Sequence, residues 1–153
     1  MPHETIFYRC PRCENMVTLR HKSDATVICC GEPAIELIPN AGDAVGALHL
    51  PEVTFVGGYT ANAAKVSIGG LPHPMTDEHH LEWIYLQTVQ GGQFKYLEAG
   101  TVSLVTFALT GKDGYSYCDR PVCMMGTECK FKCKGGFTAY AYCNIHGLWK
   151  TQT

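Results

Sequence analysis

Short hydrophobic stretches, separated by glycine pairs, run along most of the chain. They are rich in Val, Ile, Thr, Phe and Tyr, which favour strands, and none has the length and period of an ordinary helix. The glycine pairs at 57–58, 69–70 and 91–92 mark turns between them. The pattern predicts an all-β domain, a β-sandwich, over residues 37–153. Its expected strands are Val53–Val56, Ala63–Ile68, Leu81–Val89, Gln93–Leu97, Ser103–Leu109 and Phe137–Tyr142.

The first 36 residues differ, because they hold four cysteines in a short, turn-rich segment. Two short strands are expected there, Met16–Arg20 and Thr26–Cys29, around the polar turn His21–Asp24. A segment of fewer than about 40 residues rarely folds on a hydrophobic core alone, and a bound metal would supply the missing stabilisation. We therefore expect residues 1–36 to form a small metal-binding domain.

Composition narrows the class of protein. The 153 residues, of 16.8 kDa, allow one ordinary domain or one with a small appendage. The formal net charge of -2 argues against a protein that coats nucleic acid. No apolar run approaches the roughly 18 residues of a membrane span, and Met1–Thr5 lacks the basic and apolar character of a secretory signal. We expect a cytoplasmic protein with no nucleic-acid or membrane partner.

Nine cysteines are the unusual feature of the composition. In a reducing cytoplasm they indicate metal binding rather than disulfides, and their odd number leaves at least one without an intramolecular disulfide partner. Cys10-Pro11-Arg12-Cys13 is a C-x-x-C motif, and Cys29-Cys30 follows sixteen residues later. Two such pairs can bring four thiolates onto one tetrahedral metal, iron or zinc, with two disulfides as the alternative.

The segment Thr110–Gly136 interrupts the strand pattern, because it is long, polar and rich in cysteine. A loop of this length without structure of its own is unusual in a compact domain, so we expect it to be cross-linked or to serve as a functional insertion. Its cysteines could ligate a [4Fe-4S] cluster, hold one other metal ion or form two disulfides. We favour the iron–sulfur cluster, since neighbouring lysines could offset its negative charge. The four cysteines are Cys118, Cys123, Cys129 and Cys133, and the lysines are Lys130, Lys132 and Lys134.

Four of the seven histidines have neighbourhoods that suggest a second metal site. His73 lies between two prolines, His79 precedes a predicted strand, and His146 follows Cys143 by three residues. With His49, these residues offer four imidazoles and one thiolate, which are too many ligands for tetrahedral zinc. Five protein ligands suit a square-pyramidal iron with one open corner for a small ligand.

Five motifs resemble those of desulfoferrodoxin, the two-iron superoxide reductase family. The resemblance covers nearly the whole chain except about residues 110–136, and it implies a desulforedoxin-like domain followed by an immunoglobulin-like β-sandwich. It further implies that Cys10, Cys13, Cys29 and Cys30 hold one iron, and that His49, His73, His79 and His146 hold the catalytic iron equatorially with Cys143 as axial ligand. The motifs are Tyr8–Cys13, Cys29–Pro33, Pro72–Met75, His79–Ile84 and Cys143–Trp149.

The activity implied by this resemblance is the one-electron reduction of superoxide to hydrogen peroxide at the mononuclear iron. An external electron donor, such as a rubredoxin-like protein, would re-reduce the iron. The chain departs from the family at Ala47-Leu48, where the family has Glu-Lys directly before the first histidine ligand. A non-enzymatic electron carrier or redox sensor is the alternative, although a carrier needs no open coordination position.

The cysteine-rich insertion is similar to that of methanoferrodoxin, a superoxide reductase type with an added iron–sulfur cluster. The strand Phe137–Tyr142 would carry Cys143 roughly 20 Å from the end of the insertion. A cluster in the insertion could then feed the catalytic iron only from a neighbouring subunit, so we expect a homo-oligomer. Structural cross-linking of the insertion is the alternative.

Overall fold

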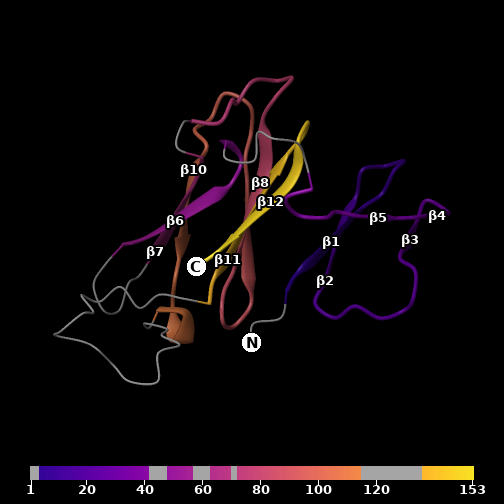
Figure 1. Cartoon of the computed structure of the whole chain (residues 1–153), viewed down its shortest axis with the longest axis horizontal. Coiled ribbons are helices and arrows are strands. Elements are labelled where there is room, and N and C mark those ends of the chain that lie inside the picture. Colours follow the sequence, from indigo (N-terminus) through magenta and orange to yellow (C-terminus); the bar gives the residue numbers. More distant parts are fainter. Residues whose placement is uncertain (1–3, 42–47, 57–62, 70–71, 115–135) are drawn as a thin grey trace.

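The computed structural model describes residues 4–41, 48–56, 63–69, 72–114 and 136–153 (Figure 1). The described residues form twelve strands and the short 3-10 helix η2 (Gly111–Gly114). The predicted all-β class is therefore confirmed. No helix in these ranges has the length and hydrophobicity that crossing a membrane requires.

Two antiparallel sheets form the larger unit, as expected for a β-sandwich. Apolar residues at alternate positions along the strands form its core. Val66, Ile84 and Phe107 are among them and are fully buried. One sheet has the order β10-β7-β6, and the other has the order β12-β11-β8-β9. Their bounds are β6 (Pro51–Val56), β7 (Ala63–Ile68), β8 (Leu81–Gln87), β9 (Gly92–Tyr96), β10 (Leu104–Ala108), β11 (Thr138–Cys143) and β12 (Gly147–Gln152).

The sandwich strands agree with their predicted positions to within about two residues, except that β12 was not expected. β12 begins at a glycine and contains polar residues, so it lacks a strong strand signal. It forms because Thr138–Cys143 is buried along its whole length and pairs with β8 on one side and with β12 on the other.

The N-terminal unit consists of two small sheets, of order β2-β1-β5 and β3-β4. The two predicted strands exist, but they are not each other's partners, because β1 pairs with β2 and β3 pairs with β4. The bounds are β1 (Ile6–Arg9), β2 (Met16–Leu19), β3 (Ile28–Cys29), β4 (Glu32–Pro33) and β5 (Ile35–Glu36).

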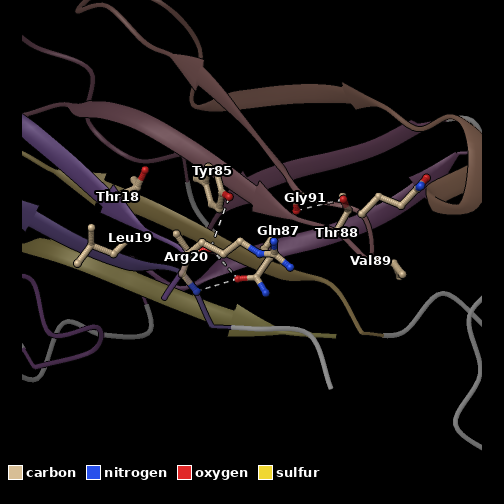
Figure 2. Close-up of a pocket in the computed structure, with 10 residues that line it drawn as sticks. Thr18, Leu19, Arg20, Tyr85, Gln87, Thr88, Val89 and Gly91 are labelled. Carbon is tan, nitrogen blue, oxygen red and sulfur yellow. Dashed lines mark hydrogen bonds between the residues drawn. The ribbon is translucent and has the colours of Figure 1, made fainter. Parts of the chain in front are cut away.

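The N-terminal unit packs on the outer face of the four-stranded sheet. Phe7 of β1 is only 1% exposed and lies among aromatic side chains of the sandwich, with ring centroids 5.1 Å from Trp83 and 5.0 Å from Tyr140. Thr5 donates two hydrogen bonds to the side-chain oxygen of Gln87, at 3.0 and 2.9 Å, beside a pocket of about 340 Å³ between the two units (Figure 2). Aromatic packing therefore adds to any stabilisation that a metal supplies to this unit.

Both flanks of the segment 115–135 lie at one end of the sandwich. The carboxylate of Asp113 accepts hydrogen bonds from the Thr88 hydroxyl (2.9 Å) and the Gln90 N–H (3.1 Å), at the turn between β8 and β9. On the other flank, Thr138 pairs with Gln87, whereas Cys143 pairs with Leu81 at the far end of the same two strands. These flanks therefore lie at the end away from Cys143, as expected. The four cysteines of the insertion lie outside the described residues.

Candidate metal centres

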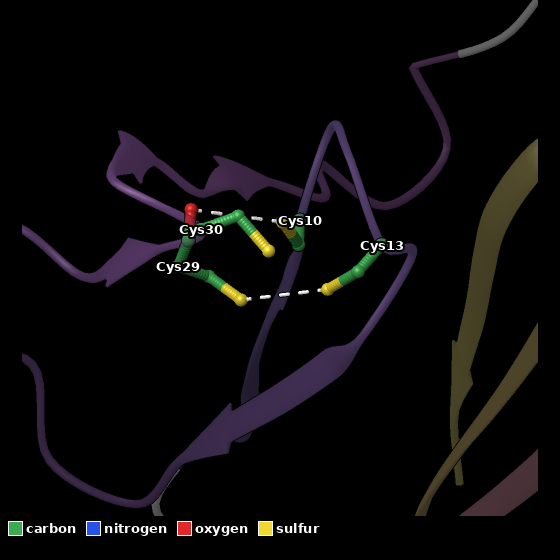
Figure 3. A group of neighbouring side chains, drawn as sticks. All are labelled: Cys10, Cys13, Cys29 and Cys30. Carbon is green, nitrogen blue, oxygen red and sulfur yellow. Dashed lines mark hydrogen bonds between the residues drawn. The ribbon is translucent and has the colours of Figure 1, made fainter.

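The first four cysteines converge in the N-terminal unit (Figure 3). The sulfur atoms of Cys10, Cys13, Cys29 and Cys30 all lie within 4.8 Å of one another, and the Sγ atoms of Cys13 and Cys29 are 3.6 Å apart. All four are free thiols. The predicted grouping is therefore present, and its four soft donors suit one tetrahedral metal ion better than two disulfides.

Turns at both cysteine pairs aim the sulfurs at a common point. The N–H of Arg12 donates to the sulfur of Cys10 at 3.4 Å, so the C-x-x-C turn folds around that sulfur. Adjacent residues of a regular strand would face opposite sides. Cys30 instead has a φ of 52°, followed by Gly31 at 75°, so the chain turns directly after Cys29 and both sulfurs reach the site.

The cysteine site favours a thiolate at Cys10. Hydrogen bonding from the backbone of Cys13 lowers the pKa of Cys10 to about 6, and hydrogen bonding to Cys10 raises the pKa of Cys29 to about 12. The pKa of Cys30 is also raised, mainly by its hydrogen bond to Cys13. A thiolate at Cys10 beside the protonated thiols of Cys29 and Cys30 forms a site that a cation would complete by displacing the remaining protons.

A second group lies at the end of the sandwich where β11 ends. One ligand atom from each of His49, His73, His79 and Cys143 lies within 4.8 Å of the others. The ring of His146 joins them, with centroids 4.5 Å from that of His49 and 4.9 Å from that of His79. Its Nδ1 lies 3.6 Å from the sulfur of Cys143. The structure therefore brings together all five residues expected at this site.

His73 is held so that one ring nitrogen remains available to a metal. Its Nδ1 lies 2.7 Å from the carbonyl oxygen of Pro74, which fixes the proton on Nδ1 and leaves a lone pair on Nε2. Its backbone N–H donates to the hydroxyl of Ser103 at 3.2 Å. Burial lowers the pKa of His73 to about 4, so the ring is neutral at physiological pH.

The burial of the imidazole nitrogens fits a metal. Among the described residues, the buried Nε2 atoms of His73 and His79 have no hydrogen-bond partner. Burial also lowers the pKa of His79, and the charge of His146 acts in the same direction. Buried polar atoms normally find partners. Neutral imidazoles grouped with a buried thiol form the donor set of a transition-metal ion, so the residues present fit an iron.

A β-bulge places Cys143 at this site. The pairing of β11 with β8 shifts register between Tyr142 and Cys143, so that Cys143 pairs with Leu81 and Glu82 is passed over. Leu81 and Cys143 both face the core and are fully buried. Without this shift, Glu82 would take the position opposite Cys143 and would bring a carboxylate beside the thiol.

Backbone contacts and aromatic stacking hold His49. Gly69 donates its N–H to the carbonyl of Leu50 at 3.0 Å, and a Cβ at Gly69 would lie 2.8 Å from the carbonyl oxygen of Leu48. This close approach keeps the segment Leu48–Leu50 against β7. The ring of Trp149 stacks on His49, with centroids 5.2 Å apart and planes at 23°.

Supporting residues were not identified from the sequence. Ser103 acts on His73 from a distant segment and the Pro74 carbonyl acts from the next residue, and a serine or proline carries no distinctive signal for such a role. Trp149 lies in the C-terminal motif, but its stacking on His49 depends on the fold. Leu48 is 44% exposed, while Ala47 lies outside the described residues. The pocket in Figure 2 is lined by no histidine, cysteine or carboxylate, so it offers no comparable metal site.

Comparisons with known proteins agree with this geometry. The desulfoferrodoxin family matches residues 41–152. A desulfoferrodoxin of Nitratidesulfovibrio vulgaris is 29% identical over 152 residues, covering 99% of both chains. A superoxide reductase of Pyrococcus abyssi is 37% identical over 114 residues, covering 73% of this chain and 90% of its own. The crystal structure of the superoxide reductase from Treponema pallidum superposes with a TM-score of 0.71 at 27% identity, covering 99% of this chain and 100% of that chain. With two grouped metal-ligand sets at the expected positions and a match over most of its length, this chain belongs to the desulfoferrodoxin family.

Proposed function

We propose that this protein is a superoxide reductase, which reduces superoxide by one electron to hydrogen peroxide. The observation that carries this conclusion is the convergence of four imidazoles and one buried thiol at the end of β11. Five such ligands suit an iron that keeps one position open for a small molecule. When bound there, the ferrous ion would supply the electron that reduces superoxide.

Each ligand residue has a role that follows from its environment. Imidazole is a neutral ligand, so the rings of His49, His73, His79 and His146 would hold the metal without adding negative charge. Cys143 would contribute the only thiolate, and its electron density would make the metal more reducing and favour release of the peroxide product. The burial of Cys143, His49 and His73 limits the access of water to the thiolate and to these two rings.

Two protons must reach the product, and a negatively charged substrate must reach the site. The family's Glu-Lys pair would be expected to serve these steps, but Leu48 is an exposed apolar residue directly before His49. We propose that superoxide is not steered by a cation at this position. Capture would then be slower, and less sensitive to salt, than in members that have the lysine.

We also propose that the chain consists of two domains, residues 1–36 and residues 37–153. Cys10, Cys13, Cys29 and Cys30 would hold a second iron, separate from the reaction. A rubredoxin-like protein would act as external electron donor, in a cytoplasm reducing enough to keep the thiols free.

The cysteine-rich insertion is the second part of the proposal. We infer a [4Fe-4S] cluster at Cys118, Cys123, Cys129 and Cys133, as in methanoferrodoxin. The support is four cysteines within sixteen residues, close to three lysines. The flanks of the insertion lie at the end of the sandwich away from Cys143. A cluster held there would serve the catalytic iron across a subunit boundary, in a homo-oligomer.

The reaction is tested by mixing the anaerobically purified, chemically reduced protein with superoxide and following superoxide decay and iron oxidation together. We expect rapid decay with one iron oxidised per superoxide consumed. His73→Ala should lose both signals, whereas substitution of the exposed His21 should change neither. Superoxide decay no faster than in the buffer alone would refute the proposed activity.

A further inference from the structure

Asn144 connects the end of β11, which carries Cys143, to the loop that carries His79. It follows Cys143 directly, in the three-residue turn between β11 and β12. Its side-chain oxygen accepts the backbone N–H of His80 at 2.9 Å, and its side-chain Nδ2 donates to the carbonyl of Glu78 at 3.0 Å. Its own N–H donates to the carbonyl of His80 at 3.1 Å. These three bonds reach the residues on either side of His79.

The other hydrogen bonds of the loop that carries His79 mainly join residues within that loop. The N–H of Thr76 donates to the carbonyl of His79 at 2.9 Å, and the hydroxyl of Thr76 accepts the N–H of His79 at 3.1 Å. These bonds give the loop a shape but do not place it relative to Cys143. The regular ladder between β8 and β11 ends at the pair of Leu81 and Cys143. Beyond that pair, Asn144 holds the end of the loop next to β8, whereas the carbonyl of Met75 at the other end accepts the N–H of Gly100.

We propose that Asn144 is a positioning residue that sets the separation of His79 from Cys143 at the catalytic metal. The inference rests on the metal centre proposed above. The amide satisfies both side-chain bonds at once, since its oxygen accepts from an N–H and its NH2 group donates to a carbonyl. Aspartate would keep the bond from His80 but would face the Glu78 carbonyl with a negative oxygen. Alanine would remove both bonds.

Asn40 provides a matched control. Its side-chain oxygen accepts the N–H of Lys150 at 2.8 Å, and its Nδ2 donates to the carbonyl of the same residue at 3.3 Å. This amide therefore joins two segments by the same chemistry, and its side-chain partner, Lys150, is neither a metal ligand nor next to one in the chain. Asn40 has a φ of 59°, so Asn40→Ala also introduces backbone strain and should destabilise the fold at least as much as Asn144→Ala.

The first measurement is amide hydrogen exchange of His80 in the metal-free protein. We expect faster exchange at His80 in Asn144→Ala, but not in Asn40→Ala. The second measurement is a titration with Co2+, followed through the ring-proton resonances of the site histidines, which report this centre and not the cysteine site. We expect Co2+ affinity to fall about 10- to 100-fold in Asn144→Ala, as for other residues that orient metal ligands. Asn144→Asp should lie between Asn144→Ala and the wild type, and Asn40→Ala should bind Co2+ normally.

Unchanged His80 exchange and unchanged Co2+ affinity in Asn144→Ala would overturn the inference. An equal loss of affinity in Asn40→Ala would also overturn it, because general destabilisation would then explain the effect. A wild-type protein that binds no Co2+ at the histidines would refute the proposed function instead. In that case, the exchange rate of the His80 amide in the metal-free protein still shows whether Asn144 holds the His79 loop to the end of β11.

Discussion

His73 should make the metal-free protein sensitive to acid over a defined range of pH. Burial lowers the pKa of His73 from 6.5 to about 4, although the Pro74 carbonyl acts in the opposite direction. The unfolded chain therefore binds a proton near pH 6.5 that the folded chain excludes until about pH 4. The contribution of His73 to the free energy of unfolding should be fully present above pH 6.5, fall as the pH is lowered from 6.5 to about 4, and level off below about pH 4. At about 1.4 kcal/mol per pH unit, the free energy of unfolding should drop by about 3 kcal/mol.

The assay is urea unfolding of the metal-free protein at several pH values between about 7 and 4. His73→Gln keeps a polar side chain at the site but cannot titrate, so its pH dependence should be smaller than that of the wild type by about 3 kcal/mol. His79 should leave part of the dependence in place, because burial also lowers its pKa. The exposed His21, changed to Gln, is the control and should retain the full dependence. A His73→Gln variant as acid-sensitive as the wild type would refute the reasoning.

Three further changes test other parts of the structure. Cys143→Ser should abolish the thiolate-to-iron absorption band and most activity, because Cys143 is the one sulfur ligand among the five residues proposed to hold that iron; an unchanged band would contradict the assignment. Leu48→Lys should raise the rate of superoxide capture at low ionic strength and lose the gain in salt, measured by pulse radiolysis; an unchanged rate at low salt would contradict steering at this position. Phe7→Ala should lower the free energy of unfolding by about 3–5 kcal/mol, because Phe7 is buried among aromatic rings, whereas Tyr96→Ala, at an 80% exposed site, should cost less than about 0.5 kcal/mol. Equal effects of the last two changes would show that Phe7 does not anchor the N-terminal unit.

Much of the sandwich could be predicted because its strands carry strong local signals. Ala63–Ile68 was predicted at its observed bounds, since β-branched and apolar residues there lie between turn signals. β1 was missed because Ile6–Arg9 is short and runs directly into the first cysteine motif. The strand pairing in the N-terminal unit was not evident either, because two- to four-residue strands carry too little pattern to select a partner.

The packing of the N-terminal unit on the sandwich could have been anticipated from one signal. Leu81–Gln87 and Thr138–Cys143 carry mostly apolar and aromatic residues on both faces, and a strand with two buried faces belongs to a sheet that is covered on both sides. The residue that provides the cover, Phe7, could not be identified from its neighbours in the sequence. Its burial depends on where β1 docks.

The metal-ligand sets were easier to predict than their supporting residues. C-x-x-C and the C-terminal Cys143–Trp149 motif are compact, and cysteine and histidine have few roles that demand such grouping. Ser103 and Asn144 act through side-chain hydrogen bonds to backbone atoms of distant segments. Such contacts leave no pattern along the chain, because any loop with the right geometry could supply them.

The stoichiometry of the reaction tests the central claim most directly. The reduced protein is mixed anaerobically with superoxide, and hydrogen peroxide and dioxygen are both measured. A superoxide reductase with iron at His49, His73, His79, His146 and Cys143 should form one peroxide for each superoxide consumed and release no dioxygen. Release of one dioxygen for every two superoxide anions would indicate dismutation and would contradict the account.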